Sequence, residues 1–305
     1  MEHELKKFGV KNPEIKFFVI RLTLGGGIFS NYNNVLYLLK YAEDQNLTPV
    51  IDYENYPNYQ REPNKVNGTG NSWNYFHEQP SEYSLKEVYK SKHVILSNNR
   101  SQFYFNKLDF KYFFDAKVLN EEYQLNELNR LTKKIPYNRS TNQFIDEKLD
   151  NIFCDKKNII GVFLRGTDYA NKKLALDHYI PMSVEESLKI TKERIKENGY
   201  DYVYLSTEQL EYLDYFRNEF GDKLIYLERP RWNEKDFDLN EHILEQRFNR
   251  KNDRYLTGLE YLAETEGLLR CDHIIGSLTN AFYYVIIRNS EFSKKVELID
   301  KGLHD

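Results

Sequence analysis

Apolar and amphipathic segments alternate along the chain, and this alternation predicts strands and helices in turn. Near the N-terminus, residues 17–22 (FFVIRL) and 48–52 (TPVID) are mainly apolar and predict buried strands. Between them, residues 30–45 place apolar side chains at helical spacing, after a glycine-bearing turn at 23–27. A strand, a glycine turn, a helix and a second strand form one βαβ unit, which predicts an α/β structure.

The middle of the chain is less regular. Residues 53–80 are rich in Tyr, Asn, Pro and Gly and predict a long loop, a kind of segment that is usually functional. Beyond it we expect a helix at 84–89, a strand at 93–96 and a helix at 120–134. A polar stretch at 138–157 then separates the two halves of the chain.

The second half repeats the strand–loop–helix pattern. The run at 158–164 (NIIGVFL) predicts a fully buried strand. Further strands are expected at 202–205, 224–227 and 273–275, and helices at 183–198, 210–220, 257–269 and 281–288. Such repetition is typical of a parallel sheet with helices on both faces. We therefore expect two domains, residues 1–150 and 151–305.

Composition and charge exclude some classes of partner. Of 305 residues, 40% are hydrophobic and 30% charged, as in soluble globular proteins. The 43 Lys and Arg against 47 Asp and Glu give a net charge of −4. A protein that follows a phosphate backbone carries a basic excess, so nucleic acid is not expected as a partner.

The N-terminus and the cysteines predict a cytoplasmic protein. The sequence MEHELKKFGVKNPE lacks the apolar core of a signal peptide, and no apolar run is long enough to cross a membrane. Cys154 and Cys271 each lie in an apolar sequence context, which predicts two buried thiols in a reducing compartment. We expect no transmembrane segment and, at most, peripheral contact with a membrane-borne partner.

Loops with glycines or polar side chains follow four of the predicted strands, each just before a helix. In open parallel sheets, ligands bind beyond the carboxyl ends of the strands, and helix N-termini there favour phosphate. The residues are Gly25, Gly26 and Gly27; Arg165 and Asp168; Ser206, Thr207 and Glu208; and Ser277, Leu278, Thr279 and Asn280. Their positions predict a site for a phosphate-bearing ligand.

Arg165 is the strongest candidate in this set. A guanidinium stays charged, matches phosphate with paired donors, and would stabilise the negative charge of a diphosphate leaving group. The alternative is that Arg165 and Asp168 form a structural ion pair at a strand end, because structural pairs and functional clusters look alike in sequence. The other candidates also have structural alternatives. The glycine turn would form a tight corner, and the hydroxyls of Ser277 and Thr279 would cap a helix.

No metal or cofactor site is indicated. Asp236-Phe237-Asp238 has the Asp-x-Asp form that holds a cation and a diphosphate, but it lies in a charged stretch with no strand before it, which predicts a solvated loop. The histidines and cysteines lack metal-ligand spacing, and no Gly-x-Gly-x-x-Gly follows a strand. A nicotinamide oxidoreductase is therefore the least favoured enzyme class.

Several short motifs resemble a known superfamily. Residues 161–169 (GVFLRGTDY) look like the His-x-Arg-Arg-Thr-Asp motif of the α-1,6-, α-1,2- and peptide O-fucosyltransferases, and 25–33 (GGGIFSNYN) is similar to their first motif. Ser206-Thr207-Glu208 stands in the place of their Thr-Asp strand end, and 276–280 in that of their last, serine-rich motif. The run at 71–76 (NSWNYF) resembles uncharacterised proteins of bacterial capsule and polysaccharide gene clusters.

The resemblance implies a GT-B-like fold, in which two Rossmann-type domains with parallel sheets face across a cleft. The N-terminal domain would lie on the acceptor side, and the C-terminal one would bind a nucleotide sugar. The implied reaction moves L-fucose from GDP-fucose to a glycan or polysaccharide acceptor, with inversion and without a metal or other cofactor. The residues implied in nucleotide-sugar binding are Gly26, Gly27, Asn31, Arg165, Asp168, Ser206, Thr207, Glu208, Ser277 and Thr279.

Two departures from the motif leave alternatives open. Phe163 stands where the motif has its histidine, and Gly166 where it has its second arginine. Lys172 or Lys173 would supply the missing cation, or the donor is another sugar nucleotide such as a GDP-heptose. From a different class, the chain would be a non-catalytic nucleotide- or glycan-binding protein.

The general base of an inverting transfer is not fixed by any motif. It needs a carboxylate or an imidazole within reach of the acceptor hydroxyl. His178 and Glu54 are the catalytic candidates beside Arg165, and Asp52, Glu264 and Glu266 are further ones. The loop at 53–80 is expected to face the acceptor.

Overall fold

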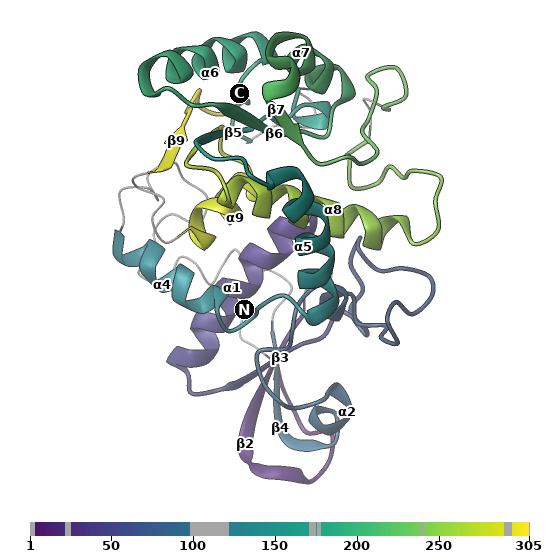
Figure 1. The fold of residues 1–305 in the computed structure, drawn as a ribbon. Helices are drawn as coiled ribbons and strands as arrows, with labels where there is room; N and C mark the ends of the chain where they lie inside the picture. The colour runs from purple at the N-terminus through teal and green to yellow at the C-terminus, as the bar shows by residue number, and fades with distance from the viewer. Residues whose placement is uncertain are drawn as a thin grey trace. The chain divides into compact units, whose positions relative to one another are not determined.

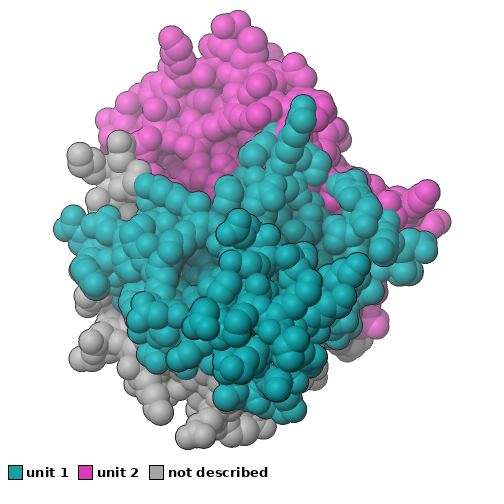
Figure 2. Space-filling view, turned by 90° about the horizontal axis from the view of Figure 1, so that it is seen from below, with its two compact units in different colours: residues 1–113, 120–142 teal, residues 114–119, 143–305 magenta. Residues whose placement is uncertain are grey.

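The chain forms two compact units. The computed structural model describes residues 4–21, 26–97, 122–170, 175, 178–238, 241–289 and 295–304. The described residues before position 143 belong to the first unit and those from Gln143 on to the second (Figure 2). The division falls inside helix α5 (Arg139–Phe153), which also contains the predicted boundary at residue 150.

The first unit contains a four-stranded sheet in the order β1-β4-β2-β3 (Figure 1). Its strands are β1 (Glu4–Lys6), β2 (Lys11–Ile20), β3 (Thr48–Ile51) and β4 (Ser91–Leu96). β2 pairs in parallel with β3 and β4, whereas β1 pairs antiparallel with β4. The predicted βαβ unit is confirmed, because the helix α1 connects β2 to β3.

Helix α1 (Ile28–Asp44) begins directly after Gly27 and buries most of its length. Val35, Leu36, Leu39 and Ala42 are among its buried side chains, and this helical spacing is why the segment folds as a helix. The other helices of the unit are the 3-10 turn η1 (Ser72–Tyr75), α2 (Leu85–Val88) and α4 (Glu122–Thr132). The predicted loop at 53–80 thus contains one short helical turn.

The second unit contains a five-stranded, all-parallel sheet in the order β7-β6-β5-β8-β9. Its strands are β5 (Ile159–Phe163), β6 (Tyr202–Ser206), β7 (Leu224–Tyr226), β8 (His273–Gly276) and β9 (Val296–Leu298). Its helices are η3 (Thr167–Ala170), α6 (Val184–Asn198), α7 (Leu210–Phe220), η4 (Gly221–Lys223), α8 (Asp253–Leu269) and α9 (Asn280–Arg288), besides α5. The α/β class with parallel sheets is confirmed.

The order of these strands creates a topological switch point. The chain starts at β5 in the middle, winds outward through β6 and β7, and then crosses to β8 on the other side of β5. Loops that leave β5 and β8 therefore run in opposite directions from neighbouring strand ends. In open α/β sheets, the crevice outside such a switch point is where ligands bind.

Strand β5 is buried on both faces, as its unbroken apolar sequence predicts. Ile160 and Val162 pack in one cluster with Leu213 and Phe216 of α7. On the opposite face, a Cβ atom at Gly161 would lie only 2.9 Å from Sγ of Cys271, so the glycine lets the segment after α8 approach the strand closely.

One expectation needs correction, and two findings add to the sequence analysis. The polar stretch at 138–157 is mostly helical, since α5 covers most of it and buries Ile145 and Leu149. Cys154 lies in the turn after α5 and is exposed, so only Cys271 is a buried thiol. The strands β1 and β9 were not predicted. Within the described ranges, no helix has the length and apolarity needed to cross a membrane.

Candidate functional site

The loop after β5 carries a strained residue. Thr167 has a φ of 51°, in the left-handed region, whereas the other described non-glycine residues with positive φ are all Asn or Asp. For a β-branched residue this conformation is an outlier that costs about 1–3 kcal/mol and persists only where surrounding contacts enforce it. Such strain concentrates at functional sites, and here it lies two residues after Arg165, the top candidate from the sequence.

Arg165 lies between two carboxylates. Its Nη2 donates to Oδ1 of Asp168 at 2.7 Å, and its Nη1 is 3.2 Å from Oε1 of Glu208. Burial alone would lower the pKa of Arg165, but the charges of Glu208 and Asp168 raise it above its ordinary value. The guanidinium is therefore a fixed cation, and its side chain keeps 14% of its surface exposed.

Glu208, two residues after the end of β6, holds the strained loop. Its Oε1 accepts hydrogen bonds from the backbone N–H of Gly166 at 2.8 Å and from the hydroxyl of Thr167 at 3.1 Å. The N–H of Thr167 donates to Oε1 of Gln209 at 3.1 Å. A Cβ at Gly166 would lie 2.0 Å from that same amide oxygen, so a larger residue here would displace the Gln209 side chain from the loop. The loop thus presents N–H donors to acidic and amide oxygens, as a phosphate-binding loop would to an anion.

Asp168 is ionised and fixed on its other side by the segment that follows β7. The backbone N–H of Ile243 donates to its Oδ2 at 3.2 Å, and Nδ1 of His242 lies 3.6 Å from the same oxygen. Burial would raise the pKa of Asp168, but the Arg165 charge and the N–H of Ile243 lower it overall. The structural pairing of Arg165 with Asp168, which the sequence left open, is therefore present.

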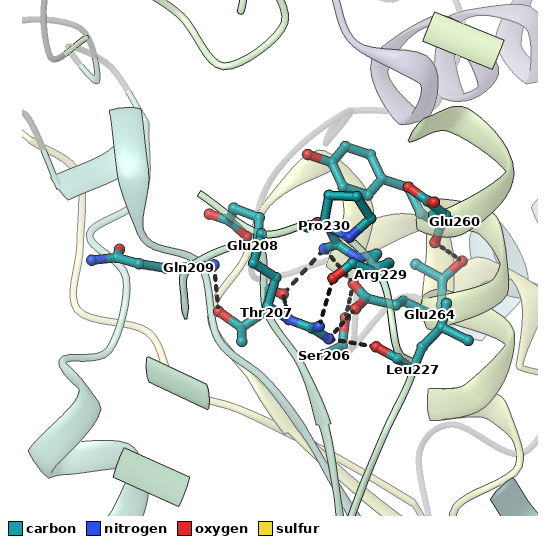
Figure 3. A network of polar contacts seen from close by, with 12 residues as sticks. Ser206, Thr207, Glu208, Gln209, Leu227, Arg229, Pro230, Glu260 and Glu264 are labelled. Atoms are coloured by element: carbon teal, nitrogen blue, oxygen red, sulfur yellow. Dashed lines mark hydrogen bonds and ion pairs between the residues drawn. The ribbon is translucent and has the colours of Figure 1, made fainter. Parts of the chain in front are cut away.

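Two arginines that the sequence analysis missed bind the backbone of Thr207. Arg229 and Arg231 both donate to the carbonyl oxygen of Thr207, each at 3.1 Å, and both pair with Glu264 of α8. Figure 3 shows Arg229 between Thr207 and Glu264. A signal was available, because the two arginines follow the strand β7 as the other candidates follow β5, β6 and β8. The buried Ser206 donates to the same Glu264 at 3.3 Å.

Beyond β8, the two predicted hydroxyls are buried and have local partners. Oγ of Ser277 accepts from the backbone N–H of Met182 at 3.0 Å. Oγ1 of Thr279 caps α9 by accepting from the N–H of Phe282 at 3.1 Å. Neither hydroxyl donates its hydrogen to a described residue, so each has a donor left for a ligand. Because β8 pairs directly with β5, the loops after these two strands begin at the same edge of the sheet.

In the first unit, Gly26, Gly27 and Asn31 surround the start of α1. Asn31 donates from Nδ2 to the carbonyl oxygen of Gly26 at 3.0 Å and to Oε1 of Gln60 at 2.9 Å. Its Oδ1 is buried and has no hydrogen-bond partner among the described residues. Gly25 lies outside the described residues. An unpaired buried acceptor is uncommon in proteins and indicates a place where a further donor fits.

The base candidates differ in their surroundings. Glu54, in the first unit, is half-buried, and its carboxylate makes no hydrogen bond or ion pair with any described residue. Asp52 is fully buried and accepts from two backbone N–H groups and from the hydroxyl of Tyr89. His178, in the second unit, packs edge-on against the ring of Tyr169 with centroids 5.0 Å apart.

The remaining candidates are peripheral or undescribed. Glu266 pairs with Arg288 at 2.7 Å, and Lys172 and Lys173 lie outside the described residues. Asp236 and Asp238 are exposed on the segment after β7. In the part of the chain that the structure describes, no three His, Cys, Asp or Glu side chains are placed to hold a metal ion.

Comparison with known proteins gives similarities of structure only. No protein-family model and no curated protein matches the sequence. Among solved structures, NodZ α-1,6-fucosyltransferase soaked with GDP-fucose has a TM-score of 0.48 and 16% identity, over 89% of this chain and 91% of that one. POFUT1 in complex with GDP has a TM-score of 0.47 and 8% identity, over 93% and 99%. Likeness this distant does not determine family or activity.

Proposed function

We propose that the chain is a glycosyltransferase that takes a sugar from a nucleotide-diphosphate donor, with GDP-fucose as that donor. One observation carries the proposal: Arg165 is a fixed cation beside the topological switch point of a parallel sheet, on a loop strained at Thr167. Its Nε makes no hydrogen bond to a described residue, so the guanidinium has donor capacity left for a phosphate oxygen.

The proposed reaction is an inverting displacement without a metal. An acceptor hydroxyl oxygen bonds to the anomeric carbon of the sugar while the bond from that carbon to the diphosphate breaks. The electron pair of the broken bond leaves with the diphosphate, and Arg165 stabilises the charge that develops there. The acceptor proton passes to a general base, for which Glu54 and His178 are the proposed candidates.

The other assignments follow the strand ends. Ser277 and Thr279, beyond β8, would donate to the phosphates, and Ser206, Thr207 and Glu208 would line the ribose or the base. In the first unit, the unpaired Oδ1 of Asn31 would accept from a donor or acceptor hydroxyl. L-fucose and a glycan or polysaccharide acceptor, as in capsule biosynthesis, are proposed from the sequence motifs. A cytoplasmic location is proposed from the N-terminal sequence and the cysteines.

The test is a titration of the purified protein against GDP, UDP, GDP-fucose and NAD, with and without Mg²⁺ or Mn²⁺. A ligand at about 100 times its dissociation constant stabilises the native state by roughly 2.7 kcal/mol, which a thermal shift detects. We expect stabilisation by GDP and GDP-fucose without metal. No response to any guanine nucleotide would contradict the proposal, and a donor that binds but is never cleaved, even with glycan acceptors present, would indicate a binding protein instead.

A further inference from the structure

The carbonyl group of Thr207 is held by two arginines at once. Nη2 of Arg229 and Nε of Arg231 each donate to its oxygen at 3.1 Å. Both side chains are almost completely buried, with 1% and 2% of their surface exposed. Buried guanidiniums are rare because removing a charge from water is costly, so this arrangement needs a compensating group nearby.

Glu264 is that group. Its Oε2 is 2.8 Å from Nη2 of Arg229, and its Oε1 is 3.0 Å from Nη2 of Arg231, so one carboxylate bridges the two cations. Burial and the neighbouring Arg229 lower the pKa of Arg231, and the charge of Glu264 opposes both effects. Without this carboxylate the two guanidiniums would repel each other at close range in a poorly screened environment.

The bridge is connected to Arg165 through the backbone just after β6, at Thr207 and Glu208. Thr207 is followed by Glu208, whose carboxylate pairs with Arg165 and holds the loop after β5. The segment that carries the two arginines also fixes the next peptide, since the N–H of Trp232 donates to the carbonyl oxygen of Glu208 at 2.8 Å. In Figure 3, Thr207 and Glu208 lie to the left of Arg229, and Glu264 lies to its right.

We infer that Glu264 is a positioning residue for the diphosphate site: by holding Arg229 and Arg231 on the carbonyl of Thr207, it sets the place of Glu208 and thereby of Arg165. The inference rests on the proposed function. In this role Glu264 contacts no substrate, and both of its carboxylate oxygens are already hydrogen-bonded. It acts on ligand affinity from the middle of α8.

The chain offers a matched control on the same helix. Glu260 lies one turn before Glu264 and binds both Nη atoms of Arg250, each at 2.7 Å, but has no bond to Thr207 or Arg229. Replacing either residue by glutamine keeps the shape and removes one buried carboxylate. A purely structural role would make Glu264→Gln and Glu260→Gln behave alike, whereas a positioning role would separate their effects on ligand affinity from their effects on stability.

Calorimetric titration of GDP and thermal unfolding are measured for the wild type and both variants. We expect Glu264→Gln to weaken GDP binding about tenfold or more. Glu260→Gln should keep the GDP affinity within about twofold of the wild type, even if its unfolding temperature falls as far as that of Glu264→Gln. Equal GDP affinity in Glu264→Gln and the wild type would overturn the inference. If the wild type binds no guanine nucleotide, the proposed function fails instead.

A second variant decides the matter if Glu264→Gln does not fold. Arg231→Lys keeps the positive charge beside Glu264 but loses the fork that reaches Thr207 and Leu227. We expect weaker GDP binding by this variant in the folded state. Unchanged affinity would show that the carbonyl of Thr207 needs no such support and would also overturn the inference.

Discussion

Two clusters in the second unit have the same chemical composition and different settings. Arg165 pairs with Asp168, three residues later, and with a second carboxylate, Glu208. Arg250 likewise pairs with Asp253, at the same spacing, and with Glu260. The Arg-x-x-Asp pattern alone does not distinguish the two clusters. The difference is where the fold puts them: one follows a parallel strand at the switch point, and the other begins a helix.

The two arginines also differ in how completely they are used. Nε of Arg250 bonds Asp253 at 2.6 Å, and both of its Nη atoms bond Glu260, one of them also Thr257. Its guanidinium therefore has a partner at every nitrogen. Among the described residues, Arg165 has partners at its Nη atoms and none at Nε. A fully bonded arginine stabilises the fold, whereas one with an unused donor at a strand end can also hold a ligand.

The strongest test of this comparison replaces both arginines. We expect Arg165→Ala to reduce GDP affinity about 100-fold or more, because a charge-assisted contact to phosphate is lost and two carboxylates are left facing the ligand. Arg250→Ala should change GDP affinity by less than about twofold, although it also leaves two carboxylates unpaired. Calorimetric titration measures both, with circular dichroism as the check on folding. Similar affinities for both variants would remove the basis for the phosphate assignment.

The backbone gives a second, smaller contrast. Thr167 in the first cluster and Asn252 in the second each stand two residues after the arginine, and both have positive φ, of 51° and 54°. Asparagine tolerates this conformation and threonine does not, so Asn252→Thr should destabilise the protein by about 1–2 kcal/mol. Denaturant unfolding measures the change. If the variant is as stable as the wild type, a left-handed threonine carries no cost here, and the strain at Thr167 gives no reason to infer function.

Much of the fold could be predicted from the apolar pattern. Strand β5 is apolar throughout, and its predicted position was confirmed. Helix α5 was missed because only two of its apolar side chains, Ile145 and Leu149, are fully buried, and ten of its 15 residues are polar or charged. The short strands β1 and β9 were missed for a related reason, since both are exposed or only partly buried and lack an apolar core segment.

The candidate site could be predicted only in part. The strand-end rule brought together Arg165, Asp168 and Glu208, which the structure confirms as neighbours. Arg229 and Arg231 also follow a strand, but their contacts could not be predicted, because both donate to a backbone carbonyl, which every residue has and no sequence pattern marks. Their burial depends on a carboxylate more than 30 residues later, Glu264, as separations of 35 and 33 residues show. The arrangement of the two predicted domains across a cleft stays a prediction.

The smallest expected effect is a loss of stability at acid pH, when Asp168 of the first cluster becomes protonated. The pKa of this carboxyl is lowered in the folded protein, mainly because Arg165 and the N–H of Ile243 outweigh its burial. A carboxyl with a lowered pKa binds fewer protons folded than unfolded, so its ionised form stabilises the fold above its unfolded pKa of about 3.9. That contribution is lost as the pH falls through the folded value.

We therefore expect the unfolding temperature of Asp168→Asn to lie below that of the wild type by a constant amount from neutral pH down to about pH 5, and the gap to narrow below about pH 4. Thermal unfolding of both proteins across this pH series measures the gap. A gap that does not depend on pH would mean that Asp168 acts through its shape and hydrogen bonds and not through its charge. Arg165 would then owe its position to Glu208 alone, and the two clusters would differ in electrostatics as well as in location.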